Sequence, residues 1–65
     1  MIKTTNPYSG QSAMLNEQEH KLYTDIKSDE ILAEETGNHD YYDTMQKKLD
    51  KFSRLNVSAY MTLLD

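Results

Sequence analysis

Between residues 41 and 55, apolar side chains recur every three or four positions. They are Tyr41, Met45, Leu49, Phe52 and Leu55. This spacing places them on one face of an α-helix, because a helix advances about 100° per residue. Polar side chains occupy the other face, namely Asp43, Gln46, Lys47, Asp50 and Arg54. The segment is therefore predicted to be an amphipathic helix that buries its apolar row against another element.

The short length of the chain limits how much it can bury. It has 65 residues, of which 37% are hydrophobic, and its mean hydropathy is -0.84, so a single domain with a thin core is expected. The absence of cysteine excludes disulfides and thiolate metal sites. Small scaffolds that lack such cross-links often gain stability by association. We therefore expect a protein partner or self-association.

A first helix is predicted from about residue 17 to residue 35. Asn16 and Glu19 have the spacing of a capping box, in which each side chain bonds the other residue's backbone N–H. Gly37 suits the left-handed residue that ends such a helix, and Asn38 or Asp40 would then cap the next one. Ile31 and Leu32 fall outside the apolar sector of the first helix. They are expected to contact something other than the second helix.

A break at Asn56 separates the second helix, residues 40–55, from a short third helix, residues 57–64. Asn56 can cap a new helix, and the apolar row starts afresh with Val57, Tyr60, Met61 and Leu64. The short connection around Gly37 makes the first two helices antiparallel. The predicted fold is all-α: a helical hairpin with a short third helix in residues 16–65, preceded by an extended N-terminal arm in residues 1–15.

The arm contains the turn sequence Asn6-Pro7-Tyr8-Ser9-Gly10. Proline fixes φ at the second position of a type I turn, so the arm has a specified shape. It has few apolar residues, so we expect it to add little stability and to act in recognition. The predicted partner-binding residues are Asn6, Pro7 and Tyr8 in the arm, together with Ile31, Leu32, Tyr60 and Met61 on the helices.

No group of residues indicates catalysis, a metal site or a cofactor. Glu17 and His20 have one half of a di-iron carboxylate motif, but the second half is missing, so a solvated helix start is the better interpretation. His39 and Asp40 are interpreted as residues at a helix end. No glycine-rich phosphate loop is present, because neither Gly10 nor Gly37 is followed by the required lysine. The chain is therefore predicted not to be an enzyme.

The charge distribution argues against direct nucleic-acid binding. The net charge is -4, and residues 16–40 carry eight carboxylates against two lysines. The basic residues of the second helix are interleaved with Asp43 and Asp50, which can pair with Lys47 and Arg54 four positions on. Pairing across the hairpin with the acidic residues 29–40 is also expected. The chain shows neither a signal peptide nor an apolar run of membrane length, so we expect a protein that is neither secreted nor membrane-bound.

Four segments together resemble a group of small, mostly uncharacterised helical proteins of tailed bacteriophages. These are residues 6–10 (NPYSG), 22–27 (LYTDIK), 48–52 (KLDKF) and 59–65 (AYMTLLD). Relatives tend to have proline where this chain has Val57. The resemblance implies expression in the cytoplasm of an infected bacterial host, with a place in the virion as one alternative. It implies no activity for any residue.

Two functions remain open at this point. The first is a non-catalytic phage protein that binds a protein partner, such as a minor virion component, through its arm and its aromatic and aliphatic helix surface. The second is an acidic inhibitor of a host enzyme or defence complex, which would occlude a basic, nucleic-acid-binding surface. Stoichiometric presence in purified virions would favour the first.

Overall fold

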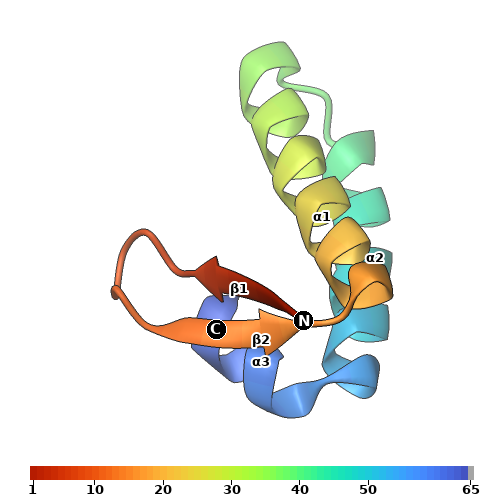
Figure 1. Ribbon diagram of the computed structural model, residues 1–65. Coiled ribbons are helices and arrows are strands. Elements are labelled where there is room, and N and C mark those ends of the chain that lie inside the picture. Colours follow the sequence, from red (N-terminus) through yellow and green to blue (C-terminus); the bar gives the residue numbers. More distant parts are fainter. Residues whose placement is uncertain (65) are drawn as a thin grey trace.

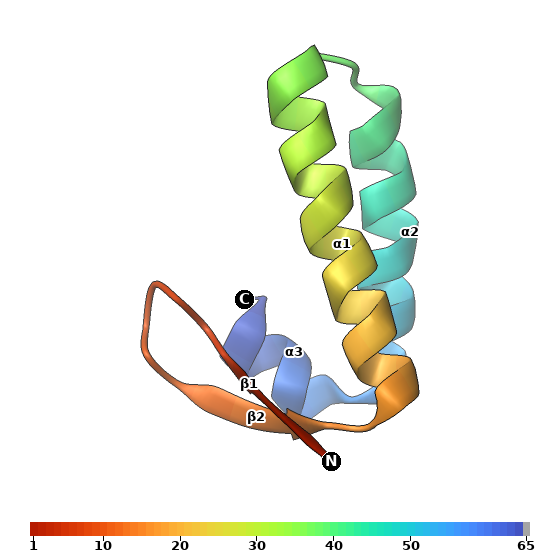
Figure 2. The ribbon, with the colours of Figure 1, turned by 45° about the horizontal axis from the view of Figure 1, so that its top comes forward.

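The computed structural model describes residues 1–64 and contains two strands and three helices (Figure 1). In chain order they are β1 (Ile2–Thr5), β2 (Ser12–Leu15), α1 (Glu17–Thr36), α2 (Asp40–Leu55) and α3 (Val57–Leu63). The long helices α1 and α2 form an antiparallel hairpin. The two strands and α3 pack together where α1 begins and α2 ends (Figure 2). The predicted helical hairpin and third helix are therefore confirmed.

The ends of α1 follow from the local sequence. The Glu19 N–H donates to the Asn16 side-chain oxygen at 2.8 Å, and the Asn16 N–H donates to the Glu19 carboxylate at 3.0 Å. This reciprocal pair is the predicted capping box. At the other end Gly37 has a φ of 69°, and its N–H donates to the Ala33 carbonyl at 2.9 Å. Both predicted ends of the helix are thus confirmed.

The starts of α2 and α3 differ in how they are capped. His39 precedes α2 in a helical conformation with no side-chain cap, so the prediction of Asn38 or Asp40 at that position is wrong. The Asn38 side chain instead accepts a bond from the Asp40 N–H, which holds the connection between the helices. Asn56 leaves the helical conformation and accepts a bond from the Ala59 N–H at 3.0 Å. The predicted break at Asn56 is confirmed.

The prediction of an extended N-terminal arm is wrong, because this segment is a β-hairpin. Strands β1 and β2 pair antiparallel, with Ile2 opposite Leu15 and Thr5 opposite Ser12. The turn between them closes with a bond from the Gly10 N–H to the Asn6 carbonyl, and Gly10 has a φ of 77°. The fold is therefore mostly helical with a small sheet, not all-α. β-Branched residues in β1 and the turn residues after it favour this pairing.

One core joins β2 to the three helices. Its fully buried side chains are Leu15 from β2, Ile26 from α1 and Phe52 from α2. The Tyr23 ring lies 6.4 Å from the Phe52 ring, and α3 adds two further buried side chains, Ala59 and Leu63. Phe52 shares this cluster with Ile26, so the predicted apolar row of α2 is buried against α1 at Phe52.

An ion pair links α1 to α2. The Lys48 ammonium lies 2.8 Å from the Asp29 carboxylate, and both side chains are partly buried. This is the predicted charge pairing across the hairpin, reduced to one contact. The pairs expected within α2, from Asp43 to Lys47 and from Asp50 to Arg54, are not formed in residues 1–64; Asp50 instead accepts a bond from the Gln46 amide. The charged link between the two helices in residues 1–64 is therefore the pair of Asp29 and Lys48.

The apolar row of α2 is only partly covered. Phe52 is fully buried, whereas Tyr41, Met45 and Leu49 are half-buried and Leu55 is exposed. A thin core cannot cover the full width of such a row. Of this row, Met45 and Leu49 line a groove on one side of the helical hairpin.

Candidate functional site

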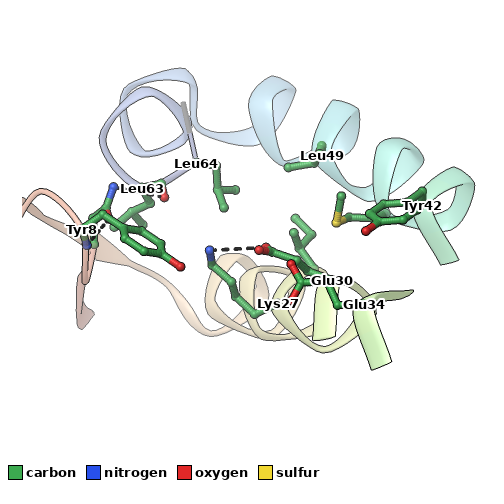
Figure 3. A pocket seen from close by; sticks show the side chains of 11 residues that line it. Tyr8, Lys27, Glu30, Glu34, Tyr42, Leu49, Leu63 and Leu64 are labelled. Carbon is green, nitrogen blue, oxygen red and sulfur yellow. Dashed lines mark hydrogen bonds and ion pairs between the residues drawn. The ribbon is translucent and has the colours of Figure 1, made fainter. Parts of the chain in front are cut away.

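The groove lies along α1 and α2 and is bounded at one end by the C-terminal end of α3 and the β-hairpin turn (Figure 3). Its volume is about 450 Å³. The residues that line it come from four parts of the chain: Asn6 and Tyr8 in the turn, Ile26, Lys27, Glu30 and Glu34 on α1, Tyr42, Met45 and Leu49 on α2, and Leu63 and Leu64 at the end of the chain.

The floor of the groove is aliphatic. Ile26 forms its base from α1, and Met45 and Leu49 are half-buried on the facing side of α2. Leu63 and Leu64 extend the apolar lining to α3. The free energy falls when another apolar group covers apolar surface that is partly open to water in this way.

Tyr8 stands at the turn end of the groove and is 89% exposed. Its ring points from the turn into the space beside Lys27 and Leu63 (Figure 3). An exposed tyrosine of this kind offers both a large apolar face and a hydroxyl for hydrogen bonding.

The backbone that carries Tyr8 is held by Asn6. The Asn6 side-chain oxygen accepts bonds from the Tyr8 N–H at 2.9 Å and the Ser9 N–H at 3.4 Å. Its amide nitrogen donates to the carbonyls of Thr62, at 3.2 Å, and Leu63, at 3.5 Å. Asn6 is itself only 8% exposed. One side chain thus shapes the turn and ties it to α3, which gives Tyr8 a defined position without burying its ring.

The charged residues of the groove lie on α1. Lys27 and Glu30 form an ion pair at 3.7 Å, and the Lys27 ammonium lies 5.7 Å from the centre of the Tyr23 ring. Glu34, one helical turn beyond Glu30, has no ion pair or side-chain hydrogen bond to any residue in the range 1–64. Its carboxylate is exposed. The groove therefore has one neutralised pair and one free negative charge.

A second hollow of about 440 Å³ adjoins the groove and shares Tyr8 with it. It brings in Pro7 from the turn and Ile31 from α1, the latter 54% exposed. Lys27, Glu30 and Glu34 also line both hollows, so the two lie side by side along this row of α1. Together they make a wider concave surface than the groove alone.

The structure brings together four of the seven predicted partner-binding residues and separates the other three. Asn6, Pro7, Tyr8 and Ile31 line one or both hollows. Asn6 is buried in a structural role, which its sequence context did not predict. Leu32 lies on another side of α1, and Tyr60 and Met61 lie on α3; none of these three lines either hollow.

Several groove residues were not predicted from the sequence. Glu30 and Glu34 repeat at a spacing of four residues after Ile26, which places all three on one stripe of α1. That spacing was available in the sequence. Met45 and Leu49 were assigned to the contact between helices, because nothing in the sequence indicates which part of an apolar row stays uncovered.

The groove presents apolar, hydroxyl and charged groups to a ligand. Its lining combines aliphatic side chains, two tyrosines and three charged groups, without a serine, cysteine or histidine among them. In residues 1–64 no three histidine or acidic side chains are grouped so that they could hold a metal ion. Over the same range, no helix is long and apolar enough to span a bilayer.

Comparison of the chain with family models, with curated proteins and with solved structures yields no match. The resemblance to small phage proteins therefore stays a prediction.

Proposed function

We propose that this chain is a non-catalytic small protein of phage type that binds a protein partner through Tyr8 and the groove beside it. The observation that carries the proposal is the contrast within the turn: Tyr8 is 89% exposed, while Asn6, two residues before it, is 8% exposed and makes bonds to both the turn and α3. A fixed backbone presents a ring that the fold itself does not bury.

Tyrosine is well suited to this role. It buries a large rigid surface on binding, loses little rotamer entropy and retains a hydrogen-bonding hydroxyl. Because the turn is already ordered, a partner does not bear the cost of ordering it. Truncation of such an anchor typically costs about 1–3 kcal/mol of binding free energy.

The test is affinity capture of the tagged full-length protein from phage-infected bacteria, followed by mass spectrometry. We expect a partner that the unmodified protein and Met61→Ala capture equally and that Tyr8→Ala captures at a level lowered about tenfold or more. Met61 is a suitable control because it is 61% exposed and lies outside the groove. Equal capture by Tyr8→Ala would refute the proposal, and loss with Met61→Ala alone would move the binding surface to α3.

A second candidate is the acidic inhibitor, and the distal end of the helical hairpin supports it. Glu34, Glu35, Asp40 and Asp43 gather there, and no lysine or arginine occurs between residues 28 and 46. Like-charged groups at one end of a molecule create a field that attracts basic surfaces. Quantitative mass spectrometry of purified virions separates the candidates: a stoichiometric amount in particles supports the virion component, and early expression with absence from particles supports the inhibitor.

A further inference from the structure

We infer that the groove accepts a peptide segment of a partner protein that carries an aliphatic side chain and, further along, an arginine or lysine. This inference rests on the proposed function and specifies the chemistry of the partner. Its aliphatic group would lie on the floor near Tyr8 and Leu63, and its cation would reach Glu34.

The apolar part of the inference follows from the floor. Met45 and Leu49 remain half-buried, and the exposed Tyr8 ring stands at the same end as Leu63 and Leu64 (Figure 3). A side chain that enters here meets aliphatic groups, one aromatic ring and the Lys27–Glu30 ion pair, whose two charges already engage each other. An aliphatic side chain covers the apolar groups of the floor, which favours it at this end of the groove.

The basic residue expected on the partner follows from how Lys27, Glu30 and Glu34 are paired. Lys27 is engaged by Glu30, so it neither repels a cation strongly nor neutralises Glu34. The facing residues of α2, Tyr42, Met45 and Leu49, carry no charge. Glu34 is thus the free ionised group of the lining, and the nearby Glu35 and Asp40 add to the negative field. A cation on the partner is the complementary group.

The length of the site sets the spacing on the partner. Lys27 and Glu34 are seven residues apart on α1, which corresponds to roughly 10 Å along the helix. An extended peptide covers that distance in about three residues. The recognised segment is therefore short, with its apolar and basic side chains about three positions apart.

A different protein fits the groove better than a second copy of this chain. The chain does present a surface of net positive charge of its own, formed by Lys47, Lys51 and Arg54 around Asp50 and beside Leu55. That surface is distinct from the groove, so a self-contact of this kind would leave a groove and a basic surface free at the two ends. Such head-to-tail contacts grow into open assemblies unless they close into a ring.

The experiment starts with selection of random 12-residue peptides on the immobilised full-length protein. Selected peptides are then labelled and titrated by fluorescence anisotropy against the unmodified protein and the variants Glu34→Gln, Glu35→Gln and Tyr8→Ala, after circular dichroism has shown that all are folded. Glu35→Gln is the matched control, because it removes the adjacent exposed charge, which does not line the groove.

We expect the selected peptides to share an aliphatic and a basic residue about three positions apart. Glu34→Gln should weaken them about three- to tenfold, Glu35→Gln should have a smaller effect, and added salt should lower affinity for the unmodified protein more than for Glu34→Gln. Tyr8→Ala should weaken binding of the peptides both with and without added salt.

Four outcomes would overturn the inference. Peptides that need Tyr8 but lack a basic residue and ignore Glu34→Gln would refute the cation site while the proposed function stands. Peptides that are indifferent to Tyr8, or a failure to select any peptide, would count against both proposals. Light scattering that shows self-association, abolished by Tyr8→Ala, would identify a second copy as the occupant and refute the inference of a different protein.

Discussion

At the scale of single residues, Asn6 forms side-chain hydrogen bonds to two separate parts of the fold. Its oxygen holds the turn through the N–H groups of Tyr8 and Ser9, and its nitrogen reaches the backbone of α3, fifty-six positions along the chain. Asparagine is suited to both because one side-chain amide contains an acceptor and a donor. Neither serine nor aspartate could replace it in full.

Replacement of Asn6 should therefore destabilise the protein. We expect Asn6→Ala to lower the free energy of unfolding by about 1–3 kcal/mol, because it leaves buried backbone groups without partners. Asn6→Asp keeps the acceptor but cannot donate to α3, so it should also be destabilising. Urea melts followed by circular dichroism measure both effects, with Tyr8→Ala in the same turn as a control of nearly unchanged stability. If Asn6→Asp leaves the free energy of unfolding unchanged, the bond to α3 contributes little.

Gly37 provides a second test at this scale. Its φ is 69°, and a Cβ added there would meet no atom within 4 Å. Any loss of stability in Gly37→Ala thus reports the cost of the left-handed conformation, which is roughly 1–2 kcal/mol for an L-residue. Gly37→Asn should lose less, because asparagine visits this conformation more readily. Equal thermal melting of all three proteins would contradict this explanation of the helix end.

At the scale of elements, the β-hairpin is part of the folded unit. Leu15 in β2 is fully buried, and Thr4 in β1 is 8% exposed. Strand β2 packs on α3, and both strands contact α1. The sequence predicted an arm that adds little stability, because residues 1–14 include few apolar side chains. Burial of Thr4 and Asn6 was not visible in that count.

Deletion of residues 1–14 should consequently lower the stability of the helical part. The deletion uncovers Leu15 and removes the Asn6 bonds to α3, which together correspond to roughly 2–5 kcal/mol. Thermal melting followed by circular dichroism at about 222 nm, where helices give a strong signal, measures the loss of stability. The double variant Lys3→Ala and Met14→Ala alters only the exposed face of the hairpin and should melt like the unmodified protein. Unchanged melting after deletion would restore the arm as an independent segment.

At the scale of the whole molecule, β2 and the three helices contribute to a single core around Phe52. That side chain is fully buried and shares its cluster with Leu15 of β2, Ile26 of α1 and Leu63 of α3. Small domains with one core generally unfold in one cooperative step. The groove is the part of this arrangement that the core leaves uncovered.

Phe52→Ala should for this reason affect all elements at once. We expect a loss of about 3–5 kcal/mol, typical of a large aromatic truncated in a core, and comparable with the whole stability of a small domain. Hydrogen exchange should then show amides of β2, α1 and α3 losing protection together. Leu55→Ala, three residues along the same helix and 43% exposed, should cost less than about 1 kcal/mol. Protection that survives in α1 and α2 alone would indicate two separate folding units.

The sequence by itself determined the three helices, both ends of α1 and the break between α2 and α3. Capping at Asn16, termination at Gly37 and the break at Asn56 depend on bonds between residues at most four positions apart. Such local interactions can be identified from spacing and residue type. The stripe containing Phe52 could also be predicted, because its period is that of a helix.

Only the tertiary structure decided the pairing of β1 with β2, the burial of Asn6 and the position of the groove. The bonds of Asn6 to α3 join residues that lie at opposite ends of the chain. Whether Met45 and Leu49 face a neighbour or remain open depends on how far the core extends. These features are set by packing over long sequence separations, where the intrinsic preferences of single residues are overridden by their surroundings.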